Sequence, residues 1–78
     1  MADDRAAEDL IEYIAKALVD DTDAVKVTLA SDGQTLELET DADDRGRVIG
    51  RQGRVAKAMR ALLGASSMGS GLRLDIVD

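Results

Sequence analysis

Residues 48–54 have the sequence Val48-Ile49-Gly50-Arg51-Gln52-Gly53-Arg54, in which an apolar pair is followed by two glycines three positions apart. Apolar residues resume helical spacing over residues 54–63, which places a tight turn at the start of a helix. Backbone N–H groups at a helix start lack intrahelical partners and carry the positive end of the helix dipole, so they favour an anion. Because glycine has no Cβ, a sugar-phosphate backbone can approach it closely. These features predict a loop that holds a polyanion.

The basic residues are concentrated around this loop, although the 78-residue chain has a net charge of −6. Residues 1–44 contain 14 acidic and three basic residues, whereas residues 45–78 contain seven basic and two acidic ones. No acidic residue lies between Arg45 and Leu74. Because a charge acts over a Debye length of about 8–10 Å, a phosphate at the loop would respond to this local basic segment.

The composition excludes most catalytic chemistry. The chain has no cysteine and no histidine, which rules out disulfides, Cys/His zinc sites and nucleophiles that depend on a histidine base. We therefore expect no enzyme, no cofactor and no metal. Tyr13 is the single aromatic residue, so bases cannot stack on an aromatic platform. No apolar run approaches the ~20 residues of a membrane span, and the acidic N-terminus is unlike a signal peptide. We expect a cytoplasmic protein with no membrane partner.

The segment before the loop predicts a β-hairpin. Residues 24–40 alternate apolar and polar side chains on either side of Asp32-Gly33, a pair favoured in two-residue type I′ turns. With that turn, apolar residues of the two strands face each other and Lys26 lies opposite Glu39. A slip of one residue would destroy both matches, so the pattern predicts the register as well as the turn.

The other elements follow from the same spacing rules. They are a helix over residues 3–20, a short helix over 45–50, a helix over 54–63 that ends at Gly64, a connection over 65–71 and a strand over 72–77. A crossover through two helices usually joins strands in parallel, so the second and third strands should be parallel. The predicted fold class is α+β, with the order α-β-β-α-α-β, a three-stranded mixed sheet and three helices on one face.

This order, with a Gly-x-x-Gly loop between the second and third helices, resembles the KH domain in its bacterial, type II arrangement. Residues 48–54 are similar to the V-I-G-x-x-G-x core of that family. The length near 80 residues, the acidic lead-in at residues 43–47 and the ending at residues 74–78 are similar to the small bacterial KH-domain RNA-binding proteins of the KhpA family. The resemblance covers essentially the whole chain, so it implies a single KH domain over residues 1–78.

In KH domains the loop clamps the backbone of about four single-stranded nucleotides, and an apolar groove receives the bases. The resemblance therefore implies a single-stranded RNA-binding protein of the RNA chaperone or post-transcriptional regulator type. Arg51 and Gln52 would face phosphate, and Leu36 and Leu38 would lie near the groove in the sheet. The implied RNA-binding residues are Gly50, Arg51, Gln52, Gly53, Arg54, Arg47, Val48, Ile49 and Lys57.

These assignments have structural alternatives. Gly50 and Gly53 could form a bend between helices that only needs positive φ. Val48 and Ile49 could belong to the core. The basic residues that follow the loop, including Arg60, could form a solvated helix face.

The acidic residues before the loop suit helix capping better than metal binding. Asp41, Asp43 and Asp44 precede a helix, where an Asp side chain accepts free backbone N–H groups. An EF-hand-like loop that starts at Asp41 would place Arg45 and Gln52 at ligand positions, and neither suits the role. We therefore expect no metal at these carboxylates.

A different class of function is a dimerising interaction subunit that binds RNA only together with a larger KH partner. The resemblance implies a homodimer or a heterodimer with a larger Jag-type KH protein. Several apolar residues of the first helix, if they exceed what one small sheet covers, would form such an interface: Leu10, Ile11, Tyr13 and Ile14. Single-stranded DNA stays open as a ligand, because the loop mainly contacts phosphate.

Overall fold

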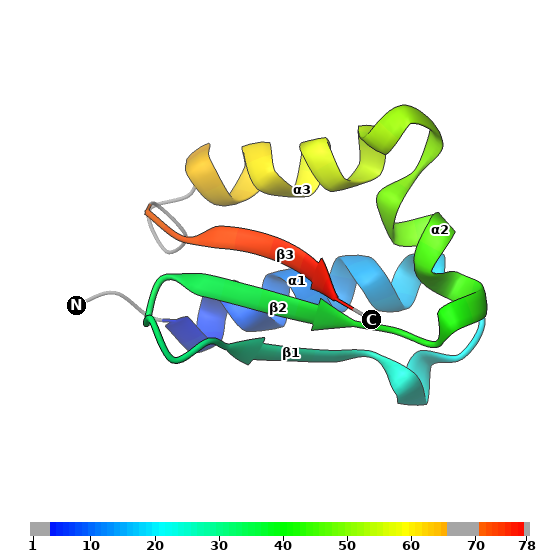
Figure 1. The fold of residues 1–78 in the computed structure, drawn as a ribbon, viewed down its shortest axis with the longest axis horizontal. Helices are drawn as coiled ribbons and strands as arrows, with labels where there is room; N and C mark the ends of the chain where they lie inside the picture. Colours follow the sequence, from blue (N-terminus) through cyan, green and yellow to red (C-terminus); the bar gives the residue numbers. More distant parts are fainter. Residues whose placement is uncertain (1–3, 66–70, 78) are drawn as a thin grey trace.

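The computed structural model describes residues 4–65 and 71–77, which form a three-stranded sheet with three α-helices packed on one face (Figure 1). In this view α1 lies behind the sheet, α3 runs alongside β3, and α2 lies at the right-hand end of the molecule. The elements are α1 (Asp4–Leu18), β1 (Lys26–Leu29), β2 (Thr35–Glu39), α2 (Arg45–Ile49), α3 (Arg54–Ala65) and β3 (Arg73–Val77). The predicted order and fold class are confirmed.

The sheet has the strand order β1-β2-β3 and the predicted register. In the antiparallel pair, Lys26 lies opposite Glu39 and Leu29 opposite Leu36. β3 is parallel to β2, with Leu36 beside Leu74. The register keeps leucines on the face that the helices cover and leaves polar side chains on the other face, so the period-2 pattern determines the pairing.

The hairpin turn differs from the predicted two-residue type I′ turn. A type I′ turn needs positive φ at both central residues, but only Gly33 (φ 72°) has it, and Asp32 does not. The Asp32 carboxylate accepts hydrogen bonds from the N–H groups of Gln34 and Thr35 and from the Thr35 hydroxyl, at 2.8–3.0 Å. These bonds, led by the one from Gln34, hold the pKa of the Asp32 carboxyl below its usual value. The Gly33 N–H donates to Ala30 O, which gives a longer turn anchored by the aspartate.

α1 places a narrow apolar stripe against the sheet. Ala7, Ile11 and Ala15 are fully buried, whereas Tyr13 is 76% exposed. The helix ends at Leu18, two residues before the predicted end, and a 3₁₀ turn (η1, Thr22–Ala24) follows. In the described ranges 4–65 and 71–77, no helix has the length and apolar character needed to span a membrane.

α3 buries Ala56, Met59 and Leu63 and continues through Ala65. The prediction that Gly64 ends this helix is therefore wrong. Gly64 is not among the glycines with positive φ, so it does not form the left-handed cap that a glycine stop requires. Most of the predicted 65–71 connection lies outside the described residues.

The core lies between the helices and the covered face of the sheet. α1, α2 and α3 each contribute to it, so all three helices are fixed by the same set of contacts. Its buried members are Ala7, Ile11, Ala15, Val19, Val25, Leu36, Leu38, Val48, Met59, Leu63 and Leu74.

Candidate nucleic-acid interface

The glycine loop is a tight turn between α2 and α3. α2 ends at Ile49, and Gly50 follows with φ 78° and ψ 169°. A 3₁₀ turn (η3, Arg51–Gly53) then leads directly into α3. Gln52 (φ 58°) and Gly53 (φ 75°) also have positive φ, and the Gly53 N–H donates to Gly50 O at 3.0 Å. Three of four consecutive residues therefore adopt a conformation that L side chains rarely take.

The two glycines of the loop are required for different reasons. A Cβ on Gly50 would lie 2.5 Å from Cγ2 of Val55 and 2.8 Å from its backbone N, so this position has no room for a side chain. A Cβ on Gly53 would meet nothing within 4 Å. Gly50 allows the loop to pack on the first turn of α3, whereas Gly53 is open to its surroundings and needs glycine only for its positive φ.

Three basic residues follow one another at intervals of three along the loop and the start of α3: Arg51, Arg54 and Lys57. All are exposed. The Arg54 guanidinium reaches Gln52 Oε1 only at 3.5 Å, the limit of a hydrogen bond. Within the part of the chain that the structure describes, Arg51 and Lys57 have no hydrogen-bond or ion-pair partner. Their charges are available to an external anion.

Two other basic residues considered in the sequence, Arg47 and Arg60, bind acceptors within the protein. Arg47 forms an ion pair with Asp20 (Nη1 to Oδ1, 3.0 Å), and its Nε lies 3.9 Å from Oδ1 of Asp44. Arg60 donates from Nε to the carbonyl oxygen of Leu74 at 3.1 Å. These two arginines differ from Arg51 and Lys57, because an external anion would have to compete with an internal acceptor.

The apolar residues assigned to the groove are mostly covered. Val48, Leu36 and Leu38 are fully buried in the core, so they support the loop and the sheet from beneath. Ile49 is 36% exposed and follows Val48 directly before Gly50. Of the apolar residues assigned from the sequence, Ile49 is the one whose side chain the structure leaves at the surface beside the loop.

Asp44 joins α2 to the end of α1. Its side chain is buried, and its two oxygens accept the backbone N–H groups of Asp20 (3.3 Å) and Asp21 (3.1 Å). The sequence predicted helix capping for Asp41, Asp43 and Asp44 together, and for Asp44 that prediction is wrong, because this side chain makes no cap bond at α2. Asp41 is the cap: its carboxylate accepts the Asp43 N–H at 2.9 Å at the start of a 3₁₀ turn (η2, Ala42–Asp44).

Replacing Asp44 with alanine should lower the free energy of unfolding by about 2–4 kcal/mol, because two backbone N–H donors lose a buried, charged acceptor. Urea denaturation of the parent and variant measures the difference. Asp44→Asn is the control, since it keeps the shape and one acceptor oxygen and should cost less. An Asp44→Ala protein as stable as the parent would show that these bonds do not hold α1 to α2.

Among residues 4–65 and 71–77, no group of three or more Asp, Glu, His or Cys side chains could hold a metal ion. The Asp41 and Asp44 carboxylates already accept backbone N–H groups, as described above.

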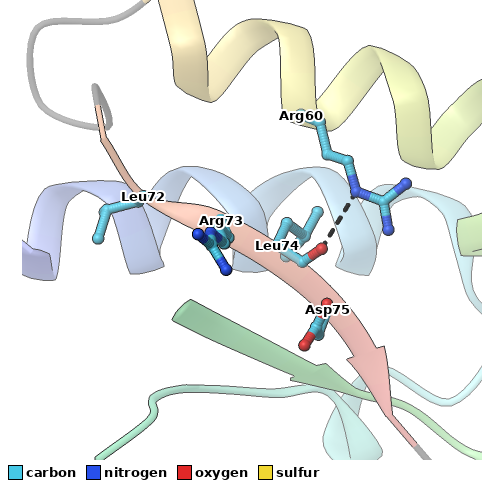
Figure 2. A pocket seen from close by; sticks show the side chains of 5 residues that line it. All are labelled: Arg60, Leu72, Arg73, Leu74 and Asp75. Atoms are coloured by element: carbon cyan, nitrogen blue, oxygen red, sulfur yellow. Dashed lines mark hydrogen bonds between the residues drawn. The ribbon is translucent and has the colours of Figure 1, made fainter. Parts of the chain in front are cut away.

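A hollow of about 340 Å³ lies between α3 and the outer edge of β3. Figure 2 shows Arg60 reaching from α3 toward the strand, with its hydrogen bond to the Leu74 carbonyl. The lining residues are Arg60, Leu72, Arg73, Leu74 and Asp75. None of them belongs to the glycine loop. The alternation of residues 72–77 predicted a strand, but nothing in that pattern showed that its edge would be hollowed.

The sequence matches the family model described as KhpA/KhpB, KH domain, over residues 8–76. The chain belongs to this KH-domain family. Its helices and mixed sheet have the type II KH arrangement, which confirms the resemblance seen in the sequence. Within this KH domain, the glycine loop lies between α2 and α3.

Curated relatives of this KH domain extend over nearly the same length. The chain is 48% identical over 73 residues to RNA-binding protein KhpA of Halalkalibacterium halodurans, a match that covers 88% of this chain and 96% of that protein. It is 42% identical to RNA-binding protein KhpA of Streptomyces coelicolor, with 91% of each chain covered. The identity to RNA-binding protein KhpA of Mycobacterium tuberculosis is 43%, with 90% and 89% covered. No solved structure gives a significant match.

Proposed function

We propose that this KH domain binds single-stranded RNA and holds its phosphate backbone with the glycine loop and the first turns of α3. The observation that carries the proposal is the combination of the positive-φ loop with exposed basic side chains that no acceptor within residues 4–65 and 71–77 occupies: Arg51 and Lys57, with Arg54 between them. The relatives named RNA-binding protein KhpA support RNA as the ligand. A function of the RNA chaperone type is consistent with a loop that contacts phosphate rather than base edges.

The loop would contact RNA through both backbone and side chains. The surroundings of Gly53 are open, so a phosphate can approach the backbone there and the N–H groups at the start of α3. Arg51, Arg54 and Lys57 would neutralise successive phosphates, and the Gln52 amide would donate a hydrogen bond. Gly50 would act by shaping the turn.

The bases would lie on the β3 side of the loop. Ile49 offers an apolar contact at the loop, and the hollow along β3 offers space beside a strand edge. Val48 would hold Ile49 and Gly50 in place from within the core, and Arg47 would reach phosphate at the α2 end of the site. Each residue that the sequence assigned to RNA binding thus receives a contacting or a supporting role.

A salt titration of binding to a fluorescent single-stranded RNA tests the proposal. For single strands, the slope of log K against log salt is about −0.7 for each phosphate neutralised. Three available cations should give a slope of about −2, and a matched single-stranded DNA would show how far the 2′-hydroxyl contributes. Binding that does not change with salt would contradict a phosphate site. No binding even at low salt would contradict the function.

A dimerising interaction subunit is the second candidate, favoured by two exposed apolar side chains. Tyr13 of α1 is 76% exposed and Leu62 of α3 is 50% exposed. Such side chains could lie in a homodimer or in a heterodimer with a larger Jag-type KH protein. Light scattering with and without that partner separates the candidates: a dimer with no RNA binding at low salt favours the interaction subunit.

A further inference from the structure

Asp20 lies next to the C-terminal end of α1 and holds Arg47, one of the cations near the glycine loop. Nη1 of Arg47 is 3.0 Å from Oδ1 of Asp20, and Arg47 precedes Gly50 by three residues. We propose, resting on the RNA-binding function above, that the Asp20 carboxylate competes with RNA phosphate for Arg47. In this role Asp20 is a specificity-determining residue that weakens the binding of small anions relative to long strands.

The Asp20 side chain is not needed to join α1 to α2. That joint is made by the backbone N–H groups of Asp20 and Asp21, which donate to the buried Asp44 carboxylate. Asp20→Asn leaves these bonds in place, because their donors are backbone N–H groups. They fix the backbone of residue 20 and so keep its carboxylate within reach of Arg47.

The ion pair is exposed, which allows a phosphate to replace the carboxylate. The side chain of Asp20 is 79% exposed and that of Arg47 is 51% exposed. Exposed ion pairs contribute little to stability, so their exchange requires no unpacking of the core. Asp44 behaves differently, because it is buried and already accepts two backbone N–H groups.

The competition favours long strands over small anions. A free phosphate must displace Asp20 by its own affinity, which is low for a single exposed contact. A strand already held at Arg51 and Arg54 presents its next phosphate to Arg47 at a high effective concentration. Asp20 therefore keeps an isolated anion from binding Arg47, whereas an RNA strand bound at several other phosphates can displace the carboxylate.

The test compares Asp20→Asn with Asp23→Asn in the same salt titration. Both variants remove one negative charge from the same acidic turn, but within the described residues Asp23 has no recorded partner. Asp20→Asn should tighten RNA binding about two- to fivefold at low salt, the range that an exposed ion pair allows. It should also steepen the salt slope by up to about 0.7, because Arg47 then contacts a phosphate in every complex and not only in those where RNA has displaced Asp20. Asp23→Asn should change neither quantity to this extent.

The same comparison in an Arg47→Gln background completes the test, since the effect of Asp20→Asn should vanish there. Equal effects of Asp20→Asn and Asp23→Asn would overturn the inference in favour of a general charge effect. Weaker RNA binding by Asp20→Asn would overturn it in favour of a structural ion pair. In both cases the parent still binds RNA, and the proposed function stands. A parent that does not bind RNA would overturn the function and the inference together.

Discussion

Replacing Arg51 and Gln52 with aspartate is expected to weaken single-stranded RNA binding by at least about 100-fold. The double variant changes the charge of the loop by three units, from one positive to two negative. At 4–6 Å in water each unit charge interacts with a phosphate by roughly 1 kcal/mol. Three units give about 3 kcal/mol, which corresponds to about 100-fold in affinity.

The double variant should keep the parent fold. Both side chains are exposed, and neither belongs to the core. Gln52 has φ 58°, a region that aspartate enters more readily than most residues do. An aspartate before the first turn of α3 also interacts favourably with the helix dipole. Urea denaturation should therefore show no loss of stability.

A control with the same change of charge lies at the far end of the molecule. Arg5 of α1 and Gln34 before β2 are both exposed, and Figure 1 shows the start of α1 and the hairpin turn at the opposite end from the glycine loop. Arg5→Asp/Gln34→Asp should reduce affinity far less in fluorescence anisotropy. Equal losses in the two double variants would show that RNA responds to overall charge rather than to the loop.

Replacing Gly50 with alanine is expected to cost about 3–5 kcal/mol in the free energy of unfolding. The backbone at φ 78° and ψ 169° is a conformation that is essentially restricted to glycine, and forcing another residue into it costs about 1–3 kcal/mol. The new Cβ would also meet the side chain and the backbone N of Val55 at less than 3 Å. Because a backbone atom of α3 cannot rotate away, the loop or the helix must shift.

Gly53→Ala is the matched control for Gly50→Ala. Gly53 has a similar φ of 75°, but its Cβ position is open, so only the conformational cost of about 1–2 kcal/mol applies. A domain of this length has a total stability of about 4–12 kcal/mol, so urea denaturation should separate the two variants clearly. Equal costs would contradict the packing role assigned to Gly50.

Local patterns were enough to predict the sheet and the loop. The alternation around Asp32-Gly33 matched Leu29 with Leu36, and the structure has that register. The turn itself was not predictable from the residue pair, because the Asp32 side chain bonds to Gln34 and Thr35 and so keeps the aspartate out of the left-handed region. The tendency of glycine to end helices predicted a stop at Gly64, but α3 continues past it and Leu63 is buried in the core.

The position of the candidate site was predictable from the sequence, but the ion pair and the hydrogen bonds beside it were not. Residue type and spacing were sufficient to locate the loop between two helices and to identify Arg51 and Gln52 as candidates. The pairing of Arg47 with Asp20 joins residues 27 positions apart, and the bonds of Asp44 span 23 and 24 positions. No local pattern encodes such contacts, because they depend on how α1 and α2 meet in the folded chain.

The hydrogen bond from Arg60 to Leu74 also bears on the exposed edge of the sheet. β3 is an edge strand, so its outer backbone groups could pair with a strand of another molecule. The Leu74 carbonyl is already occupied by the Arg60 guanidinium, and the long side chain covers that part of the edge. Arg60 thereby places a charge on this edge strand, which disfavours its pairing with a strand of another molecule.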